Sequence, residues 1–125
     1  MMEQKFYVCE ICGNLVAKVK VNDVPIMCCG KVMQEIIPGT SDASQEKHVP
    51  KYQVNGNEVV VTVGEVIHPM SEEHFIEWVS LQTKQGNQRK MLQPQNEPKI
   101  SFLIYEDDEV EAVYAYCNLH GLWKA

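Results

Sequence analysis

The sequence lacks several features that define common classes of protein. No apolar run approaches the roughly 20 residues of a membrane-spanning helix. The stretch Met1–Lys5 has neither the apolar core nor the small-residue cleavage site of a signal peptide. Internal repeats and low-complexity tracts are also missing. We therefore expect a cytoplasmic protein without a membrane partner.

Basic residues are scarce, and their scarcity is confined to one part of the chain. The net charge is −6; residues 1–37 carry four basic and four acidic groups, whereas residues 38–125 carry seven basic and thirteen acidic groups. An acidic surface repels phosphate backbones, so we expect no nucleic acid partner. The acidic run Glu106–Glu109 is either a solvated turn or a docking site for a basic partner.

Length and composition allow one ordinary domain, or a very small module joined to a modest domain. The 125 residues are 45% hydrophobic, which is enough for a core. Residues 38–44 form a polar stretch rich in turn residues and read as a linker. We therefore predict a small module at residues 1–37 and a larger domain at residues 38–125.

Short apolar segments separated by turns predict an all-β protein. Asn55-Gly56 is a strong hairpin signal, Gln85-Gly86-Asn87 is a second turn, and four prolines after the linker break any long helix. Fairly even spacing of the strands favours an antiparallel sandwich. The predicted strands are residues 5–8, 15–21 and 32–37 in the module, and 52–54, 58–63, 75–81, 99–105 and 110–117 in the domain.

Soft metal ligands are few and fall into two groups. The chain has five cysteines and four histidines, and the first 29 residues contain four of the cysteines and no histidine. Cysteines stay reduced in the cytoplasm, and an odd number fits a disulfide framework poorly, so clustered thiols indicate metal ligands. This partition predicts two metals with different roles.

The early cysteines predict a closed tetrathiolate site. Cys9 and Cys12 form a C-x-x-C turn whose two thiolates face one ion, and Cys28-Cys29 supplies the other two ligands. Four thiolates at tetrahedral geometry select zinc or iron. Because adjacent cysteines cannot splay as a second C-x-x-C would, we expect a distorted site. A module of this size has too little apolar core of its own, so the metal would also hold its fold.

The later ligands predict a different kind of centre. His68 and His74 flank a turn that begins with proline, while Cys117 and His120 stand one short turn apart, before a glycine. Four neutral imidazoles and one thiolate, with His48 as the remaining nitrogen ligand, leave a six-coordinate iron with one open position. The main-chain amides of Asn118 and Leu119 are candidates to donate hydrogen bonds to the Cys117 sulfur.

These motifs carry a family resemblance over essentially the whole chain. The module, with its vicinal cysteines, resembles desulforedoxin, and the later segments resemble the catalytic domain of superoxide reductase. Together they resemble the desulfoferrodoxin family, the two-iron superoxide reductases. The quoted motifs are Cys9-x-x-Cys12, Cys28-Cys29, Glu46-Lys47-His48-Val49-Pro50, His68-Pro69-Met70, Glu73-His74 and Cys117-Asn118-x-His120-Gly121.

The resemblance implies a fold and a set of ligands. The expected fold is a small desulforedoxin-like metal module followed by an immunoglobulin-like antiparallel β-sandwich, assembled as a homodimer. One iron is bound by the four early cysteines. A second, catalytic iron is bound by His48, His68, His74 and His120 in a plane and by Cys117 axially.

The resemblance also implies an activity. Superoxide is reduced by one electron to hydrogen peroxide in defence against oxidative stress, with rubredoxin as the electron donor. Glu46 binds the ferric iron after turnover, and Lys47 attracts the anion and assists its protonation, both from a mobile loop. The alternatives are an electron carrier or structural metal protein in which the histidines are incidental, and a zinc-ribbon interaction module.

Overall fold

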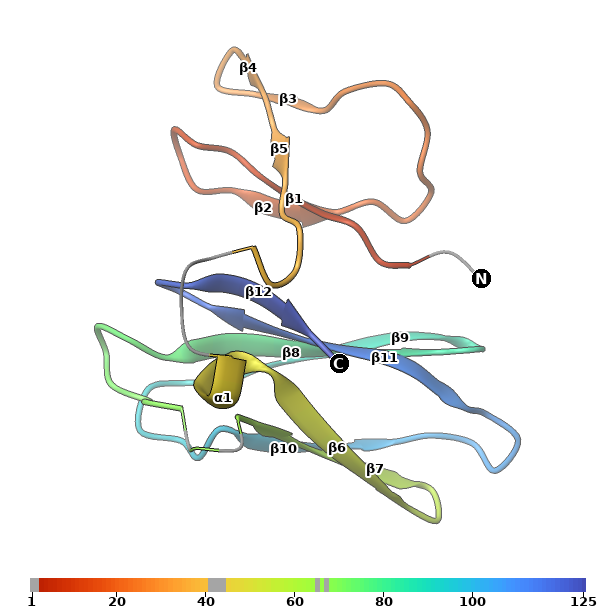
Figure 1. Cartoon of the computed structure of the whole chain (residues 1–125). Coiled ribbons are helices and arrows are strands. Elements are labelled where there is room, and N and C mark those ends of the chain that lie inside the picture. The colour runs from red at the N-terminus through yellow and green to blue at the C-terminus, as the bar shows by residue number, and fades with distance from the viewer. Residues whose placement is uncertain (1–2, 41–44, 65, 67) are drawn as a thin grey trace. The chain divides into compact units, whose positions relative to one another are not determined.

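The computed structural model describes residues 3–40, 45–64, 66 and 68–125 (Figure 1). Contacts between residues divide the chain into two compact units, Met1–Ile37 and Pro38–Ala125. Each unit is described here by itself. Within the described residues, no helix has the length and apolar character needed to cross a membrane.

The first unit consists of five short strands around very little core. Three of them form an antiparallel sheet in the order β2-β1-β5, and the other two form a separate hairpin. Its buried apolar side chains are Phe6, Cys9 and Met33. The strands are β1 (Phe6–Val8), β2 (Leu15–Ala17), β3 (Met27–Cys28), β4 (Lys31–Val32) and β5 (Gln34–Glu35).

The predicted strand at residues 15–21 is wrong beyond Ala17. Pairing with β1 ends where Phe6 faces Ala17, and the chain then leaves the sheet, so that Val19 is fully exposed. The Lys18 ammonium holds the following loop by donating to the carbonyl oxygens of Asn22 and Val24, at 3.2 and 3.4 Å. Alternating Val and Lys residues suggested a longer strand, but among the described residues no strand pairs with residues 18–21.

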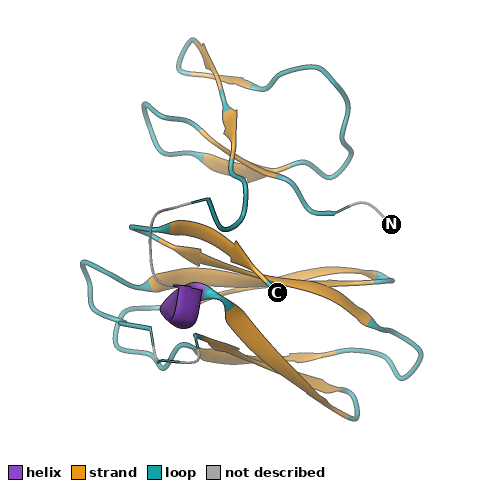
Figure 2. Cartoon of the chain, viewed as in Figure 1, coloured by secondary structure: helices purple, strands orange, loops and turns teal. Residues whose placement is uncertain are grey.

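The second unit is an antiparallel sandwich of two sheets with immunoglobulin-like strand order (Figure 2). One sheet has the order β10-β7-β6 and the other the order β12-β11-β8-β9, so the first, second and fifth strands of the unit face the other four. The all-β prediction is confirmed. The strands are β6 (Pro50–Asn55), β7 (Glu58–Val63), β8 (Ile76–Thr83), β9 (Gly86–Met91), β10 (Lys99–Leu103), β11 (Val110–Cys117) and β12 (Gly121–Lys124).

The core of the second unit lies between its two sheets. On β7, Val59, Val61 and Val63 are completely buried at alternate positions, as expected for a strand with one face on the core. They pack with side chains of β8, β10 and β11 into one cluster, whose other members are Ile76, Val79, Leu81, Leu92, Phe102, Val113, Ala115 and Cys117. The thiol of Cys117 is thus part of the apolar core.

Two strands of the sandwich, β9 and β12, were not predicted. The sequence of β9, Gly86–Met91, is almost entirely polar because the strand is an exposed edge of its sheet. The β12 strand is only four residues long. Both are formed by pairing with the apolar strands β8 and β11, which a local hydrophobic pattern does not reveal. The predicted hairpin at Asn55-Gly56 is present, with Gly56 and Asn57 as its turn residues.

Polar side chains make hydrogen bonds at two places on the periphery of the sandwich. From β9, Lys90 and Gln88 donate to the carbonyl oxygens of Ser101 and Leu103 on β10, at 2.6 and 2.8 Å, which covers an edge of the opposite sheet. In the acidic run, Asp108 accepts a hydrogen bond of 2.6 Å from the Thr83 hydroxyl. That run therefore ties one turn of the sandwich to another.

A four-residue helical turn, α1 (Gln45–His48), leads into β6 and packs against Gly64. Gly64 has a φ of +85°, and a β-carbon there would lie 2.6 Å from the carbonyl oxygen of Lys47. Its amide donates to the carbonyl of Val49 at 3.1 Å. Only glycine allows this approach. We expected Lys47 to lie on a loop, and the helical turn corrects that expectation.

We predict that Gly64→Ala destabilises the protein more than Gly56→Ala. Both glycines have positive φ, so each alanine costs about 1–2 kcal/mol of backbone strain. Only at Gly64 does the new β-carbon also meet main-chain atoms, which adds about 1–3 kcal/mol. Chemical denaturation of the parent and both variants measures the difference, and equal losses of unfolding free energy would contradict the packing argument.

Candidate metal centres

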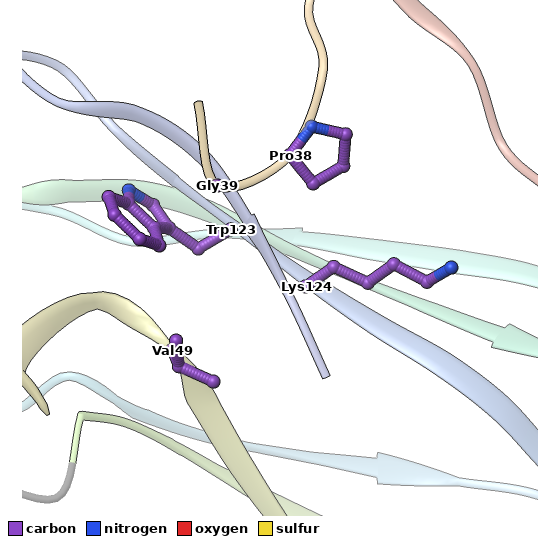
Figure 3. Close-up of a pocket in the computed structure, with 5 residues that line it drawn as sticks. All are labelled: Pro38, Gly39, Val49, Trp123 and Lys124. Carbon is purple, nitrogen blue, oxygen red and sulfur yellow. The ribbon is translucent and has the colours of Figure 1, made fainter. Parts of the chain in front are cut away.

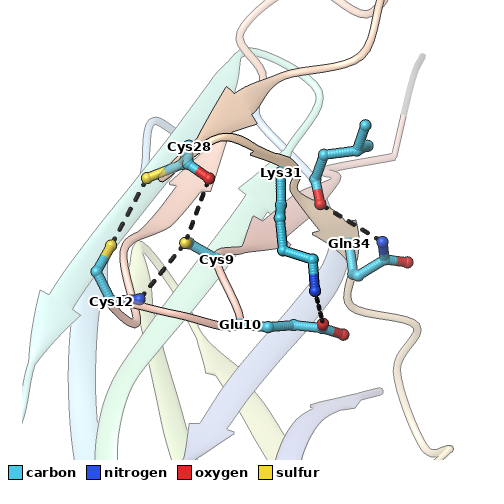
Figure 4. Close-up of polar contacts among 7 residues, drawn as sticks. Cys9, Glu10, Cys12, Cys28, Lys31 and Gln34 are labelled. Carbon is cyan, nitrogen blue, oxygen red and sulfur yellow. Dashed lines mark hydrogen bonds and ion pairs between the residues drawn. The ribbon is translucent and has the colours of Figure 1, made fainter.

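The four early cysteines converge in the first unit, where their sulfur atoms all lie within 4.8 Å of one another. The Sγ atoms of Cys12 and Cys28 are 3.6 Å apart (Figure 4). Metal–sulfur bonds of about 2.3 Å in a tetrahedron require sulfur atoms roughly 3.8 Å apart, whereas a disulfide requires about 2.05 Å. All four thiols are free. The cluster therefore fits one tetrahedral metal ion.

Tight turns bring these sulfur atoms together. The amide of Cys12 donates to the Cys9 sulfur at 3.5 Å, and the amide of Gly13 donates to the Cys9 carbonyl at 3.0 Å. In the β3–β4 hairpin, Cys29 has a φ of +53°. This left-handed conformation is costly for a residue with a side chain. The backbone of Cys29 is thus strained, while the distorted metal geometry expected from adjacent cysteines stays a prediction.

The thiols of this cluster ionise unequally. Hydrogen bonds from the amides of Cys12 and Ile11 lower the pKa of Cys9 to about 6. Hydrogen bonding with the Cys12 and Cys9 thiols raises the pKa of Cys29 to about 12, and the same two thiols raise the pKa of Cys28. The cluster therefore stabilises a thiolate at Cys9 and disfavours ionisation of Cys28 and Cys29. A bound cation would balance the thiolate charges, with release of the protons.

The four histidines surround a second point, in the second unit. Neighbouring ring centroids lie 4.6 Å apart for His48 and His68, 4.7 Å for His68 and His74, 5.0 Å for His74 and His120, and 4.9 Å for His120 and His48. Across the group, His48 and His74 are 6.2 Å apart. Neighbouring rings are nearly perpendicular. The imidazoles therefore stand at the corners of a quadrilateral, in chain order.

Cys117 belongs to the same cluster. Its sulfur lies within 4.8 Å of ligand atoms of His48, His74 and His120, and the sulfur is buried. Burial raises the pKa of Cys117, while the amides of Leu119 and His120 lower it by hydrogen bonding to the sulfur. The predicted Leu119 donor is confirmed. The predicted Asn118 donor is wrong, because that amide donates to the Phe75 carbonyl at 3.2 Å.

Two buried ring nitrogens show that this cluster fits a metal. The Nε2 atoms of His68 and His74 have no hydrogen-bond partner among the described residues. A buried polar atom without a partner is costly, and a cation between the rings would remove that cost. The Nδ1 of His68 lies 2.6 Å from the carbonyl oxygen of Pro69, which orients Nε2 toward the cluster. Burial lowers the pKa of His68 to about 4, so the ring is neutral at pH 7 and its Nε2 lone pair can bind a metal.

Trp123 supports two of the histidines, and the sequence motifs did not reveal it. Its ring stacks on His48 with centroids 4.9 Å apart and planes 25° apart. Its indole N–H donates to the carbonyl of His120 at 3.0 Å. The one available signal was an aromatic residue three positions after His120, within the unpredicted strand β12.

A cavity of about 330 Å³ adjoins Trp123 and is also lined by Pro38, Gly39 and Val49, with Val49 below Trp123 in the view of Figure 3. Lys124 completes its lining. None of the five lining residues is a histidine or cysteine, so this cavity is distinct from the metal cluster.

The charged residues predicted for the site lie on α1, directly before His48. The Lys47 side chain is exposed. The pKa of His74 is lowered by burial and then by the charges of His120, His48 and Lys47, which places the Lys47 ammonium within electrostatic reach of the cluster. The side chain of Glu46 lies outside the described part of the structure.

Comparisons with known proteins agree on one family. The family model described as desulfoferrodoxin matches residues 40–125. A desulfoferrodoxin homolog of Archaeoglobus fulgidus is 44% identical over 119 residues, covering 95% of this chain and 94% of the relative. The desulfoferrodoxin of Nitratidesulfovibrio vulgaris is 42% identical over 123 residues, covering 98% and 96%.

Solved structures extend this similarity to the fold. The superoxide reductase of Treponema pallidum has a TM-score of 0.84 and 38% identity, covering 99% of both chains. A one-iron superoxide reductase of Giardia intestinalis has a TM-score of 0.54 and 36% identity. It covers 64% of this chain and 95% of its own.

Cys117→Ser should change the visible spectrum of the iron-loaded protein at one centre only. Losing the thiolate from the histidine cluster removes its sulfur-to-iron charge-transfer absorption, while the tetrathiolate absorption remains. Cys12→Ser is the matched control, because it removes a sulfur from the other cluster and should have the opposite effect. If both absorptions persist in Cys117→Ser, the ligand assignment fails.

Proposed function

The chain belongs to the desulfoferrodoxin family, and on this premise we propose how its residues divide the work of a superoxide reductase. The reaction adds one electron and two protons to superoxide and yields hydrogen peroxide. The chain has two iron centres, one with four cysteine ligands and one with four histidines and a cysteine. The observation that carries this function is that His48, His74 and His120 converge on a buried thiol. The fourth imidazole, His68, packs against the rings of His48 and His74.

Each iron centre is assigned to one of the two units, and each proposed ligand to one of the two centres. Residues 1–37 form the iron–tetrathiolate module, and residues 38–125 form the catalytic sandwich domain. The proposed ligands of the first iron are Cys9, Cys12, Cys28 and Cys29, and those of the second iron are His48, His68, His74, Cys117 and His120. The alternative in which the histidines are incidental does not account for their convergence.

The proposed roles follow from the charge of each ligand. When bound, ferrous iron at the second centre supplies the electron. Neutral imidazoles contribute no negative charge, so the oxidised centre remains reducible. The Cys117 thiolate pushes electron density toward the metal, and the Leu119 and His120 amides moderate that charge by hydrogen bonding to the sulfur.

Lys47 is proposed to guide the substrate. Superoxide is an anion and the protein carries a net charge of −6, so a local cation is needed to focus the approach. The exposed position of Lys47 and its electrostatic effect on His74 support this role. The same ammonium would assist protonation of the reduced product. Glu46 is proposed as a carboxylate ligand of the oxidised centre, and a ferric spectrum unchanged in Glu46→Ala would reject that role.

The electron donor, the assembly and the location are further parts of the proposal. Rubredoxin is the proposed donor, and the first iron is proposed to take part in electron transport. A homodimer is supported by the exposed apolar side chains of the small unit, among them Ile11, Val24 and Met27. A monomeric mass by sedimentation would reject it. Free thiols support a reducing, cytoplasmic location.

The stoichiometry of superoxide consumption tests the activity. With excess reductant, a superoxide reductase yields one hydrogen peroxide for each superoxide consumed and releases no dioxygen. Dismutation would release half of the superoxide as dioxygen. Measuring peroxide yield and dioxygen release together separates the two, and dioxygen release at the dismutation ratio would reject the reductase assignment.

Lys47→Ala should slow the second-order reaction with superoxide by roughly tenfold at low salt, because it removes a cation that lies within electrostatic reach of His74. The rate of the variant should also depend less on ionic strength. Pulse radiolysis over a range of salt concentrations measures both effects.

Lys84→Ala is the matched control for this experiment. It removes the same charge, but Lys84 follows β8 whereas His74 precedes it, so about 30 Å of extended chain separates them. That distance exceeds the Debye length at physiological salt. Equal effects of the two variants would show that only net charge matters, and an unchanged rate in Lys47→Ala would remove Lys47 from the entry path.

A further inference from the structure

The side chain of Asn118, in the turn directly after Cys117, reaches the segment that carries His74. Its Oδ1 accepts a hydrogen bond of 2.9 Å from the amide of Phe75, and its Nδ2 donates one of 3.0 Å to the carbonyl of Glu73. Its own amide donates to the Phe75 carbonyl at 3.2 Å. Three hydrogen bonds from one residue thus engage both neighbours of His74.

This bridge begins where regular strand pairing ends. The ladder between β8 and β11 finishes with Cys117 opposite Ile76, after a register irregularity between Tyr116 and Cys117. Beyond that pair, β11 turns back toward β12 and offers no further strand to Phe75. The Asn118 carboxamide presents one acceptor and one donor to consecutive peptide groups, as a neighbouring strand would.

The segment that carries His74 is otherwise closed mainly on itself. The Ser71 amide donates to the His74 carbonyl at 3.0 Å, and the His74 amide lies 3.2 Å from the Ser71 hydroxyl oxygen, which accepts its hydrogen bond. These bonds hold the shape of the turn, but they do not attach it to β11. Asn118 makes that attachment, next to the cysteine of the cluster.

We propose that Asn118 is a positioning residue that holds the His74 imidazole in register with the Cys117 sulfur across the second metal centre. It contacts neither the metal nor the substrate, and acts through the main chain on either side of His74. The proposal rests on the assignment of His74 and Cys117 as ligands in the proposed function. A side chain of this role must combine a donor and an acceptor, which asparagine provides and aspartate does not.

The test compares Asn118→Ala with Asn118→Asp in the iron-loaded protein. Asn118→Ala should shift the sulfur-to-iron absorption and the ferric electron paramagnetic resonance signal of the second centre. The affinity of that centre for iron should fall by about 10–100-fold, the usual effect of losing a group that orients a ligand. Iron release from that centre to a chelator should therefore be faster than in the parent. Asn118→Asp keeps the acceptor for Phe75 and loses the donor to Glu73, so its shift should be intermediate. The tetrathiolate absorption should stay unchanged in both.

Asn96→Ala is the matched control, since the Asn96 Oδ1 accepts a 2.9 Å bond from the Gln93 amide in a loop that carries no ligand. It should leave absorption, resonance and iron release as in the parent. A less stable Asn118→Ala with parental spectra and parental iron release would overturn the proposal, as would identical behaviour of Asn118→Ala and Asn96→Ala. If Asn118→Ala does not fold, a parental spectrum and release rate in Asn118→Asp decide against it. Absence of the sulfur-to-iron absorption in the parent would instead reject the ligand assignment.

Discussion

The convergence of neutral nitrogen donors and one thiol on a single cation is the interaction on which the second unit depends. Among the residues that the structure describes, the cluster holds two buried ring nitrogens without hydrogen-bond partners and a thiol whose pKa is raised by burial. Burying these nitrogens and ionising this thiol both cost free energy. One bound cation would offset both costs. The arrangement of the cluster therefore favours a bound cation, and binding a cation would stabilise the folded site.

The sandwich holds the cluster by placing the ends of its strands around it. Cys117 is the last residue of β11, His120 lies in the following turn, and His74 precedes β8. Groups outside the ligand set then restrain three of the histidines: the Pro69 carbonyl restrains His68, and Trp123 restrains His48 and His120. The rigid strands fix the positions from which the ligand side chains extend. The short loops next to them allow those side chains to adopt the geometry that a metal requires.

The two centres differ in what surrounds them. The tetrathiolate cluster sits in a unit whose described residues include three buried apolar side chains, and Cys12 and Cys29 are exposed there. Its metal substitutes for a core that so short a segment cannot build. The histidine cluster borders the apolar core of the second unit, where low polarity strengthens the effect of nearby charges. The tetrathiolate cluster is suited to stabilising the fold of its unit, and the histidine cluster is suited to reacting with a small anion.

The sequence by itself determined which residues can bind metal, because ligand chemistry belongs to residue types and the C-x-x-C, Cys-Cys and Cys-x-x-His spacings are local. It also predicted an all-β sandwich, since alternation such as that of Val59 to Val63 is a local pattern. Tertiary structure alone decided how His48 meets His120, 72 residues away, and that the four rings stand in chain order around one point. It also decided the existence of β9 and β12 and the supporting roles of Trp123 and Asn118. Such features depend on pairing between distant segments. The hydrophobic pattern of one segment does not indicate which other segment it pairs with.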